Sequence, residues 1–350
     1  MEELAKSTNI SKRRISKIFV YVFGVLVFLG VVGLTGGYLT YANETSGSAG
    51  GHTLTIEVYK GDSFSGLGTR LQKLKVIKSV LFFDIYIRLH QKFVLLPGLY
   101  TMNVNDGDQR VVDVLKAGPN EFRLTVIPGM TLNQIATQVG HIPGHTSAGF
   151  LKACSTQTFI SPFLVSGSHN LEGLLSPDTY FVLPDESNHQ VIQEMINQTA
   201  TVATRAGLKL NGSTNSLTPY QELIVASLVQ REALIPSDYA KVARVIYNRL
   251  AIPMNLQFDS TVLYGLGLTG GSPTLQDLAH MTPYNTYLVS GLPPTPISAP
   301  SYAAILAAVN PAPGPWIYFV TTSANGSETF SVTYQQQLAN EAIAAQKGLE

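Results

Sequence analysis

The segment from Ile18 to Tyr41 contains no charged side chain over 24 residues, and it limits the folds open to this chain more than any other feature. At about 1.5 Å per residue, a helix of this length exceeds the ~30 Å hydrocarbon core of a bilayer. The run therefore predicts one transmembrane helix at residues 18–41. A cleaved signal peptide is the alternative, but the run is longer than a typical signal-peptide core.

The charges around this run predict its orientation. Five basic residues precede it, and the first charge after it is Glu44. Lysine and arginine collect on the cytoplasmic side, so we expect residues 1–17 to form a cytoplasmic tail and the rest to be extracytoplasmic, as in a single-pass membrane protein. After the tail, 18 basic and 21 acidic residues remain, which gives no reason to expect a nucleic-acid partner.

The chain after the span is long enough for two or three domains with their own cores. Residues 42–52 are rich in Gly and Ser and predict a flexible linker. We expect an α+β fold throughout, with subdomains at 53–118 and 119–210 and a mixed α+β domain at 217–350. Cys154 is the single cysteine, so no intrachain disulfide can staple these domains.

Two stretches share one pattern of strand, glycine turn and amphipathic helix. Gly61, Ser63 and Leu67 correspond in register to Gly129, Thr131 and Ile135. In both, a hydroxyl residue follows the turn glycine by two, which suits a helix N-cap. The pattern resembles the LysM-like units that accompany cell-wall enzymes, and an ordinary βα repeat is the alternative.

Residues Thr218 to Gln221 have the sequence of a capping box with Pro at the first helical position. The helix that follows is apolar all round and should be buried. Glu232 lies near its end, and Pro236 stops it. Apolar surroundings and the negative end of the helix dipole both disfavour a charged carboxylate, so Glu232 could act as a general acid. Alternatively, Glu232 pairs with Arg231 or a later arginine and joins helix ends.

At this point the sequence resembles a known family, the endolytic murein transglycosylases (the MltG or YceG-like family). The resemblance rests on ordered motifs that cover nearly the whole chain. These are LEGLLSPDTYFV (171–182), VASLVQREA (225–233), VARVIYNRL (242–250), LQFDSTVLYGLG (256–267), TPYNTYLVSGLPPTPISAP (282–300) and WIYFV (316–320).

The resemblance implies a lytic transglycosylase that cuts the β-1,4 bond between N-acetylmuramic acid and N-acetylglucosamine inside a nascent glycan strand. The expected product end is a 1,6-anhydromuramoyl residue, and the family's catalytic glutamate falls on Glu232. One carboxyl can serve as acid and then as base, whereas most glycosidases use two. No cofactor or metal is expected. The implied partners are peptidoglycan strands, with peptidoglycan synthases as candidate neighbours.

Further residues of the motifs are candidates for the glycan site. Asp259 is the first candidate for a second carboxylate and Glu172 the next, and a local cap is the alternative for Asp259. Gln257 could bond an acetamido group. Asn285 and Tyr287 are predicted to line the glycan groove, with loop packing as the alternative.

Four residues are accessory candidates, for which a structural explanation is open. For Asn248 and Arg249, at the end of a helix, structure is favoured over substrate binding. Glu172 and Tyr180 could join the upstream domain to the active site, or bond to each other.

The sequence departs from the family pattern where two histidines are usual, because those places hold Glu328 and Gln337. If these histidines bind substrate or tune the acid, this chain differs in pH optimum or rate. A non-catalytic, membrane-tethered glycan-binding or scaffold protein is therefore the alternative function. A metallopeptidase or serine hydrolase lacks support, since neither H-E-x-x-H nor G-x-S-x-G occurs in the sequence.

Overall fold

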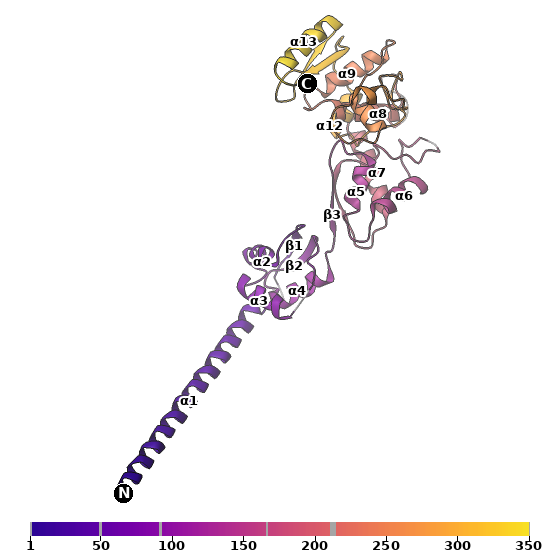
Figure 1. Ribbon diagram of the computed structural model, residues 1–350. Helices are drawn as coiled ribbons and strands as arrows, with labels where there is room; N and C mark the ends of the chain where they lie inside the picture. The colour runs from indigo at the N-terminus through magenta and orange to yellow at the C-terminus, as the bar shows by residue number, and fades with distance from the viewer. Residues whose placement is uncertain (1, 49–50, 91–92, 166, 211–214, 350) are drawn as a thin grey trace. The chain divides into compact units, whose positions relative to one another are not determined.

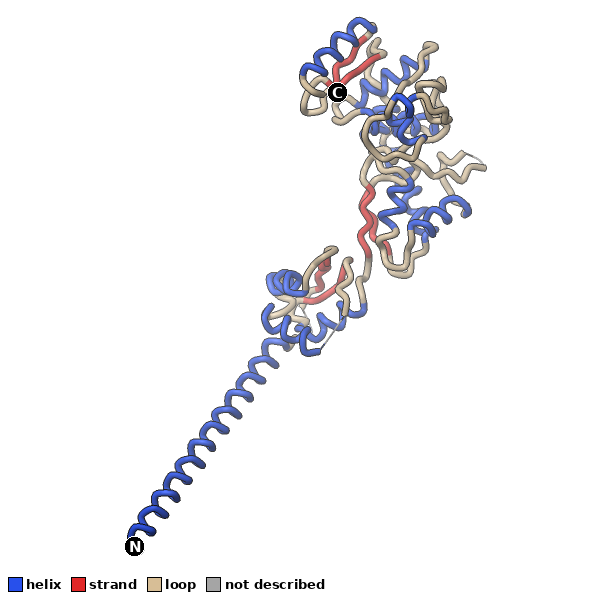
Figure 2. Tube along the Cα trace, viewed as in Figure 1, coloured by secondary structure: helices blue, strands red, loops and turns tan. Residues whose placement is uncertain are grey.

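The structure, a computed structural model, describes residues 2–48, 51–90, 93–165, 167–210 and 215–349. The chain divides into two compact units, residues 1–122 and 123–350. Both units combine helices with two-stranded sheets, so the predicted mixed α+β class is confirmed (Figure 1, Figure 2). The finer division at residues 118 and 210–217 stays a prediction.

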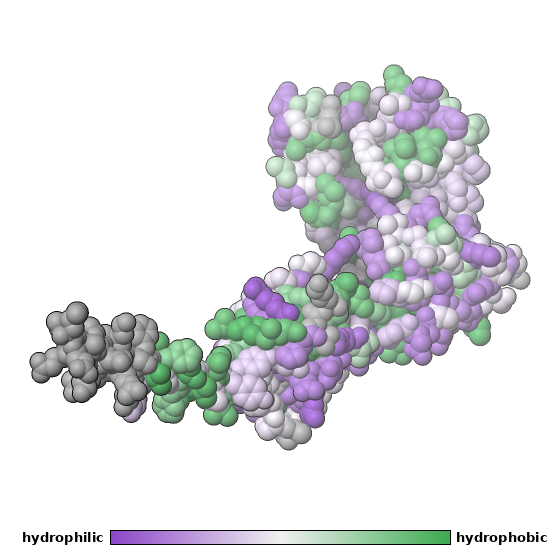
Figure 3. Space-filling view, turned by 60° about the horizontal axis from the view of Figure 1, so that its bottom comes forward, coloured by the Kyte–Doolittle hydropathy of each residue, from purple (hydrophilic) through white to green (hydrophobic). Residues whose placement is uncertain are grey.

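Helix α1 runs over Glu2–Thr45 and is longer than the predicted span of 18–41. Its segment Val20–Thr45 has a mean hydropathy of 2.1 and is long and apolar enough to cross a membrane. Figure 3 shows its hydrophobic side chains lying open along the helix. The prediction that residues 42–52 form a linker is wrong for its first residues, because the helical backbone continues to Thr45, whose hydroxyl donates to the carbonyl of Tyr41 at 2.8 Å.

The rest of the first unit is a two-stranded sheet covered by three helices. Its elements are β1 (Thr53–Val58), α2 (Phe64–Lys73), α3 (Val80–His90), β2 (Gly98–Asn103) and α4 (Gly107–Ala117). Strands β1 and β2 are antiparallel, with Ile56 opposite Tyr100. The predicted cap of α2 is confirmed, since Ser63 accepts a hydrogen bond from the amide of Gly66.

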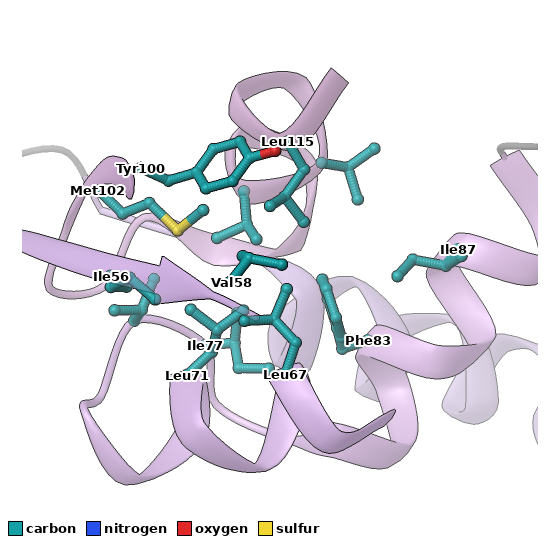
Figure 4. Packing of buried hydrophobic residues seen from close by; sticks show 13 residues of the cluster. Ile56, Val58, Leu67, Leu71, Ile77, Phe83, Ile87, Tyr100, Met102 and Leu115 are labelled. Carbon is teal, nitrogen blue, oxygen red and sulfur yellow. The ribbon is translucent and has the colours of Figure 1, made fainter. Parts of the chain in front are cut away.

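The alternation along these strands sends one face into a core. Tyr100 and Met102 of β2 point into it and are fully buried, together with Leu67 and Leu71 of α2 and Phe83 of α3 (Figure 4). At about 25 cal/mol per Å² of apolar surface, such side chains stabilise the fold by roughly 1.5–3 kcal/mol each. The core thus replaces the disulfides that this chain cannot form.

The second unit begins with a second small α+β arrangement. Its elements are β3 (Phe122–Val126), α5 (Leu132–Val139), α6 (Ser147–Thr156), β4 (Asp178–Val182) and α7 (Asn188–Arg205), and β3 pairs with β4. Thr131 caps α5 as predicted, in a capping box with Gln134. The predicted repeat of strand, turn and capped helix is therefore confirmed in both units.

The C-terminal part of the second unit is mainly helical. It contains α8 (Pro219–Glu232), α9 (Tyr239–Leu250), α10 (Asp259–Gly265), α11 (Leu275–Leu278), α12 (Tyr302–Val309), β5 (Tyr318–Thr321), β6 (Glu328–Ser331) and α13 (Tyr334–Gln346). Helix α8 is buried on every side from Glu222 to Val229, as its apolar sequence predicts, and packs against α9, α10 and α12. The predicted capping box of Thr218 and Gln221 is present.

Gly68 allows α2 and α3 to approach closely. A Cβ at this position would lie 3.0 Å from Phe83 Cδ1 and 3.3 Å from Val80 Cγ1. We therefore expect Gly68→Ala to destabilise the first unit by roughly 1–3 kcal/mol, although alanine is the better helix former. Thermal unfolding of the full chain in detergent would measure this. Thr69→Ala, on the exposed side of α2, is the control and should not lower stability in this way.

Candidate active site

Glu232 is the last residue of α8, one turn beyond the buried Leu228 and Val229. The backbone turns extended at Ala233, whose amide bonds to the carbonyl of Val229. The position predicted from the sequence, on an apolar face in a last helical turn, is confirmed. The residue as a whole keeps partial exposure, while protein surrounds its carboxylate.

Burial raises the pKa of Glu232 to about 7, against a hydrogen bond that favours the charged form. That bond comes from the hydroxyl of Ser260, which donates to Oε1 of Glu232. The charge of Asp259 raises the pKa further, whereas those of Arg231 and Arg249 lower it. Desolvation is the largest of these effects, as the apolar sequence of α8 predicts.

The alternative that Glu232 is tied up in an ion pair is wrong for the described part of the chain. Neither ion pair found there involves Glu232. Arg231 instead donates to the carbonyl of Gly129 at 3.4 Å, and Arg249 donates to that of Ile317 at 2.6 Å. The carboxyl is therefore left to titrate near neutral pH.

The segment before α10 forms one wall beside Glu232. Asp259 opens α10 and is exposed, and its Oδ1 accepts a 2.6 Å hydrogen bond from the hydroxyl of Tyr287. The local-cap alternative for Asp259 finds no support, because the bond recorded for its carboxylate joins it to a distant side chain. Burial raises the pKa of Tyr287, so its hydroxyl stays a donor. Asp259 and Tyr287 lie together, as a common site requires.

Gln257 has a backbone φ of +53°, in the left-handed region that costs a residue other than glycine roughly 1 kcal/mol or more. Two hydrogen bonds hold the strained segment, from the amide of Gln257 to the carbonyl of Thr286 and from the amide of Phe258 to the Thr286 hydroxyl, both at 3.0 Å. The side chain of Gln257 is exposed. Strain held by tertiary contacts is typical of functional sites.

Asn285 is fully buried, and its contacts favour the loop-packing alternative over a place on the glycan groove. Its amide nitrogen donates to the carbonyls of Leu278 and His280 at 2.9 and 2.8 Å. Its Oδ1 accepts from the amide of Tyr287 at 3.0 Å. Asn285 therefore fixes the loop that presents Tyr287.

Asn248 and Arg249 make contacts that favour a structural role. Asn248 donates to the carbonyls of Gly314 and Trp316 at 3.0 and 2.8 Å. The buried Arg249 donates to Ile317 and, by a second nitrogen, to the carbonyl of Leu256. The two residues thus hold the segment before β5, and Arg249 also binds the segment that leads into α10.

Glu172 and Tyr180 each bond to other partners, and the predicted alternative of a hydrogen bond between them is wrong. Glu172 is buried and accepts hydrogen bonds from the amide of Leu132 and from the hydroxyl of Tyr264, both at 3.0 Å. Burial raises its pKa to about 7. The hydroxyl of Tyr180 donates to the carbonyl of Ser176 at 2.7 Å. Glu172 thus links the start of α5 to α10.

Two polar residues of this region were not among the predicted site residues. Ser260 carried no sequence signal beyond its place next to Asp259 in the motif. Glu328 was noted as a replacement for a histidine, but its proximity was not predicted. Its amide donates to Asp238 at 2.9 Å, and its Oε2 is buried without a partner among the described residues.

Burial raises the pKa of Glu328 to about 8, and the charges of Asp238 and Glu232 add to this effect. A charge on Glu232 thus favours the protonated form of Glu328. Gln337, at the other histidine place, is buried and donates to the carbonyl of Phe319 and to Glu341. Burial thus favours the protonated form of both Glu232 and Glu328.

The chain resembles known proteins over most of its length. Residues 56–343 match the YceG-like family. The chain is 32% identical to the endolytic murein transglycosylase of Bacillus subtilis, over 81% of this chain and 82% of that protein. It is 30% identical to the protein of the same name from Streptococcus pneumoniae, over 89% of this chain and 62% of that longer protein.

A crystal structure of a YceG-like protein from Listeria monocytogenes superposes with a TM-score of 0.66 and 30% identity, covering 82% of this chain and 98% of that one. The fold and the buried acid thus belong to an enzyme of the lytic transglycosylase class. The chain is a member of the YceG-like family.

The raised pKa of Glu232 predicts how its substitution changes stability with pH. Because the folded-state pKa of about 7 exceeds the ordinary 4.5, ionisation opposes folding, and its cost appears as pH rises through this window. Glu232→Gln should therefore gain up to about 3 kcal/mol in free energy of unfolding at pH 8 and little at pH 4.5.

Urea unfolding of the full chain in detergent at the two pH values would measure this difference. Asp185→Asn, at an exposed carboxylate, is the matched control and should show no such gain. An equal effect of Glu232→Gln at both pH values would contradict the raised pKa.

Proposed function

We propose that this chain is a membrane-anchored endolytic transglycosylase of peptidoglycan, with Glu232 as its catalytic acid and base. The observation that carries the proposal is the isolated, desolvated carboxyl at the end of α8, whose pKa is raised to about 7. The names of the relatives, which specify murein, support this substrate. The bond cut would be the β-1,4 link from N-acetylmuramic acid to N-acetylglucosamine within a strand.

A pKa near 7 suits a group that must give and then take one proton. In the first step, protonated Glu232 donates its proton to the glycosidic oxygen as the bond to muramic C1 breaks. The C6 hydroxyl of the same sugar then attacks C1, and its proton passes to the Glu232 carboxylate. The product is a 1,6-anhydromuramoyl end, no water is consumed, and the acid is regenerated.

The Ser260 hydroxyl would keep the reactive carboxylate oriented while it exchanges its proton. Asp259, exposed and held by Tyr287, would face the positive charge that develops at C1. Gln257 and Tyr287 would bind the sugar, because both have partly or fully exposed side chains on the same wall. Asn285, Asn248, Arg249, Glu172 and Tyr180 would act as supports for this wall.

The finer architecture belongs to the same proposal. Helix α1 would span the membrane with the N-terminus in the cytoplasm, supported by the apolar segment Val20–Thr45 and the basic residues before it. The subdomain at 53–118 would be a LysM-like unit next to the membrane, and the catalytic domain would span 217–350. The activity would then act on nascent strands, beside peptidoglycan synthases, and end their elongation.

A non-catalytic glycan-binding protein is the second candidate, and one observation favours it. Glu328 and Gln337 occupy the places where the family usually has histidine, and both side chains are buried with an oxygen that has no partner in the described part of the chain. A product assay separates the two candidates, because binding alone leaves strand length unchanged.

The first test is the product. The full chain in detergent, incubated with uncrosslinked glycan strands, should release 1,6-anhydromuramoyl ends that mass spectrometry identifies. Glu232→Gln should reduce their rate of formation at least ~10³-fold, because a carboxamide is too weak an acid to transfer a proton. Glu222→Gln, at a buried glutamate earlier in α8, is the control and should keep activity. Persistent cleavage in Glu232→Gln would sink the mechanism.

The second test is the pH dependence. Glycan cleavage by the native chain should fall as pH rises above about 7, because Glu232 then loses its proton. The bond from Ser260 favours the charged form, so Ser260→Ala should move this fall to higher pH. Rate profiles between pH 5 and 9 would show it. An unchanged or lower apparent pKa in Ser260→Ala would rule out the assigned hydrogen bond.

A further inference from the structure

The end of α1 is fixed to the first unit by direct contacts. The ammonium of Lys78 donates to the carbonyl of Asn43 at 2.6 Å and lies 3.1 Å from the hydroxyl of Ser46. Two residues before Asn43 on α1, the ring of Tyr41 meets the ring of Phe82 edge to face, with centroids 6.2 Å apart. Both contacts lead into α3, so this helix is held beside the end of the apolar segment.

Helix geometry places these contacts relative to a bilayer. At 1.5 Å per residue, a ~30 Å hydrocarbon core takes about 20 residues. Counted from Ile18, where the charge-free run starts, the core ends close to Gly37. Tyr41, one turn further along α1, therefore lies in the outer headgroup region, and Phe82 with it. Helix α3 cannot then lie far from the headgroups.

Helix α3 carries an apolar stripe whose two leucines are exposed and whose central isoleucine is partly buried. Leu81 and Leu89 are 65% and 68% exposed, and Ile85 lies between them at helical spacing. Arg88 is exposed at seven residues from Leu81, which places it on the same face. The opposite face is buried through Phe83 and Ile87.

The segment after α3 extends the exposed apolar surface. Val94 is 77% exposed, before the chain enters β2. Figures 1 and 2 show α3 as one of the elements next to the end of α1.

We propose that this stripe of α3, formed by Leu81, Ile85, Arg88 and Leu89, lies in the outer headgroup region of the membrane that α1 spans. A helix with leucines on one face and an arginine at its edge is suited to this interface, where the leucines enter the acyl boundary and the guanidinium meets lipid phosphate. The inference rests on the membrane anchor of the proposed function. It adds that the first unit is a second membrane contact.

The position and the charge of this stripe both favour a lipid surface over a protein partner. The stripe is attached to α1 within one or two turns of the hydrocarbon boundary, so lipid is present wherever α1 is inserted. It also pairs apolar side chains with the exposed cation of Arg88, which complements anionic headgroups, and the acidic neighbour Asp84 is partly buried.

The test uses one fluorescent probe at a time on the full chain in nanodiscs. Cys154 is buried and is the single cysteine, so Cys154→Ala gives a background without thiols. Leu81→Cys and Leu89→Cys carry an environment-sensitive dye on the stripe. Thr69→Cys, on the exposed side of α2, is the control in water, and Val27→Cys, within α1, is the control in lipid. The nanodiscs contain phosphatidylcholine and phosphatidylglycerol, with or without spin-labelled acyl chains.

At Leu81→Cys and Leu89→Cys we expect blue-shifted emission that spin-labelled lipid quenches at least ~2-fold, with no change at Thr69→Cys. If Val27→Cys is quenched but the two stripe positions emit like Thr69→Cys, the inference is overturned. A blue shift without lipid quenching would also overturn it and would indicate a protein contact. Loss of quenching at Val27→Cys would instead overturn the anchor itself, and the inference with it. An additional Arg88→Glu should weaken quenching at Leu89→Cys only in discs that contain phosphatidylglycerol.

Discussion

The burial of one carboxyl at the end of α8 is the constraint on which the rest of this site depends. Helix α8 has no polar face, so the backbone brings Glu232 into an apolar environment where ionisation costs free energy. The hydroxyl of Ser260 donates a hydrogen bond to it. This balance sets the pKa of Glu232 near 7, where a carboxyl can exchange a proton in both directions.

The surrounding loops hold that balance through backbone contacts more than through ion pairs. Thr286 receives the amides of the strained segment at Gln257, and Arg249 binds the carbonyls at Leu256 and Ile317. These bonds fix where Ser260 and Asp259 can lie. Arg249 and Asn285, which the sequence offered as candidate site residues, thus fix the backbone around Glu232. The charge of Arg249 also remains close enough to lower the pKa of that acid.

Glu328 gives this chain a local feature of its own. A buried carboxyl with a pKa of about 8 adds a neutral hydrogen-bonding group beside Glu232 in mild acid, and a second charge only above neutral pH. A histidine at the same place would carry a positive charge in acid and none in base. The two residues therefore differ in the sign of the charge that they carry when ionised and in the pH range where they carry it.

Local patterns in the sequence determined a large part of this protein. The apolar run, the capped helices at Ser63, Thr131 and Thr218, and the place of Glu232 depend on neighbours within one or two turns. Two outcomes rest on contacts nearby in the sequence that no pattern reported: Asn285 is buried by bonds to residues two to seven positions away, and α1 continues to Thr45. The tertiary structure alone decided that Ser260 and Glu328 lie near Glu232, which is 28 and 96 positions away in the sequence. No periodicity or capping rule reports which distant side chains a fold brings together.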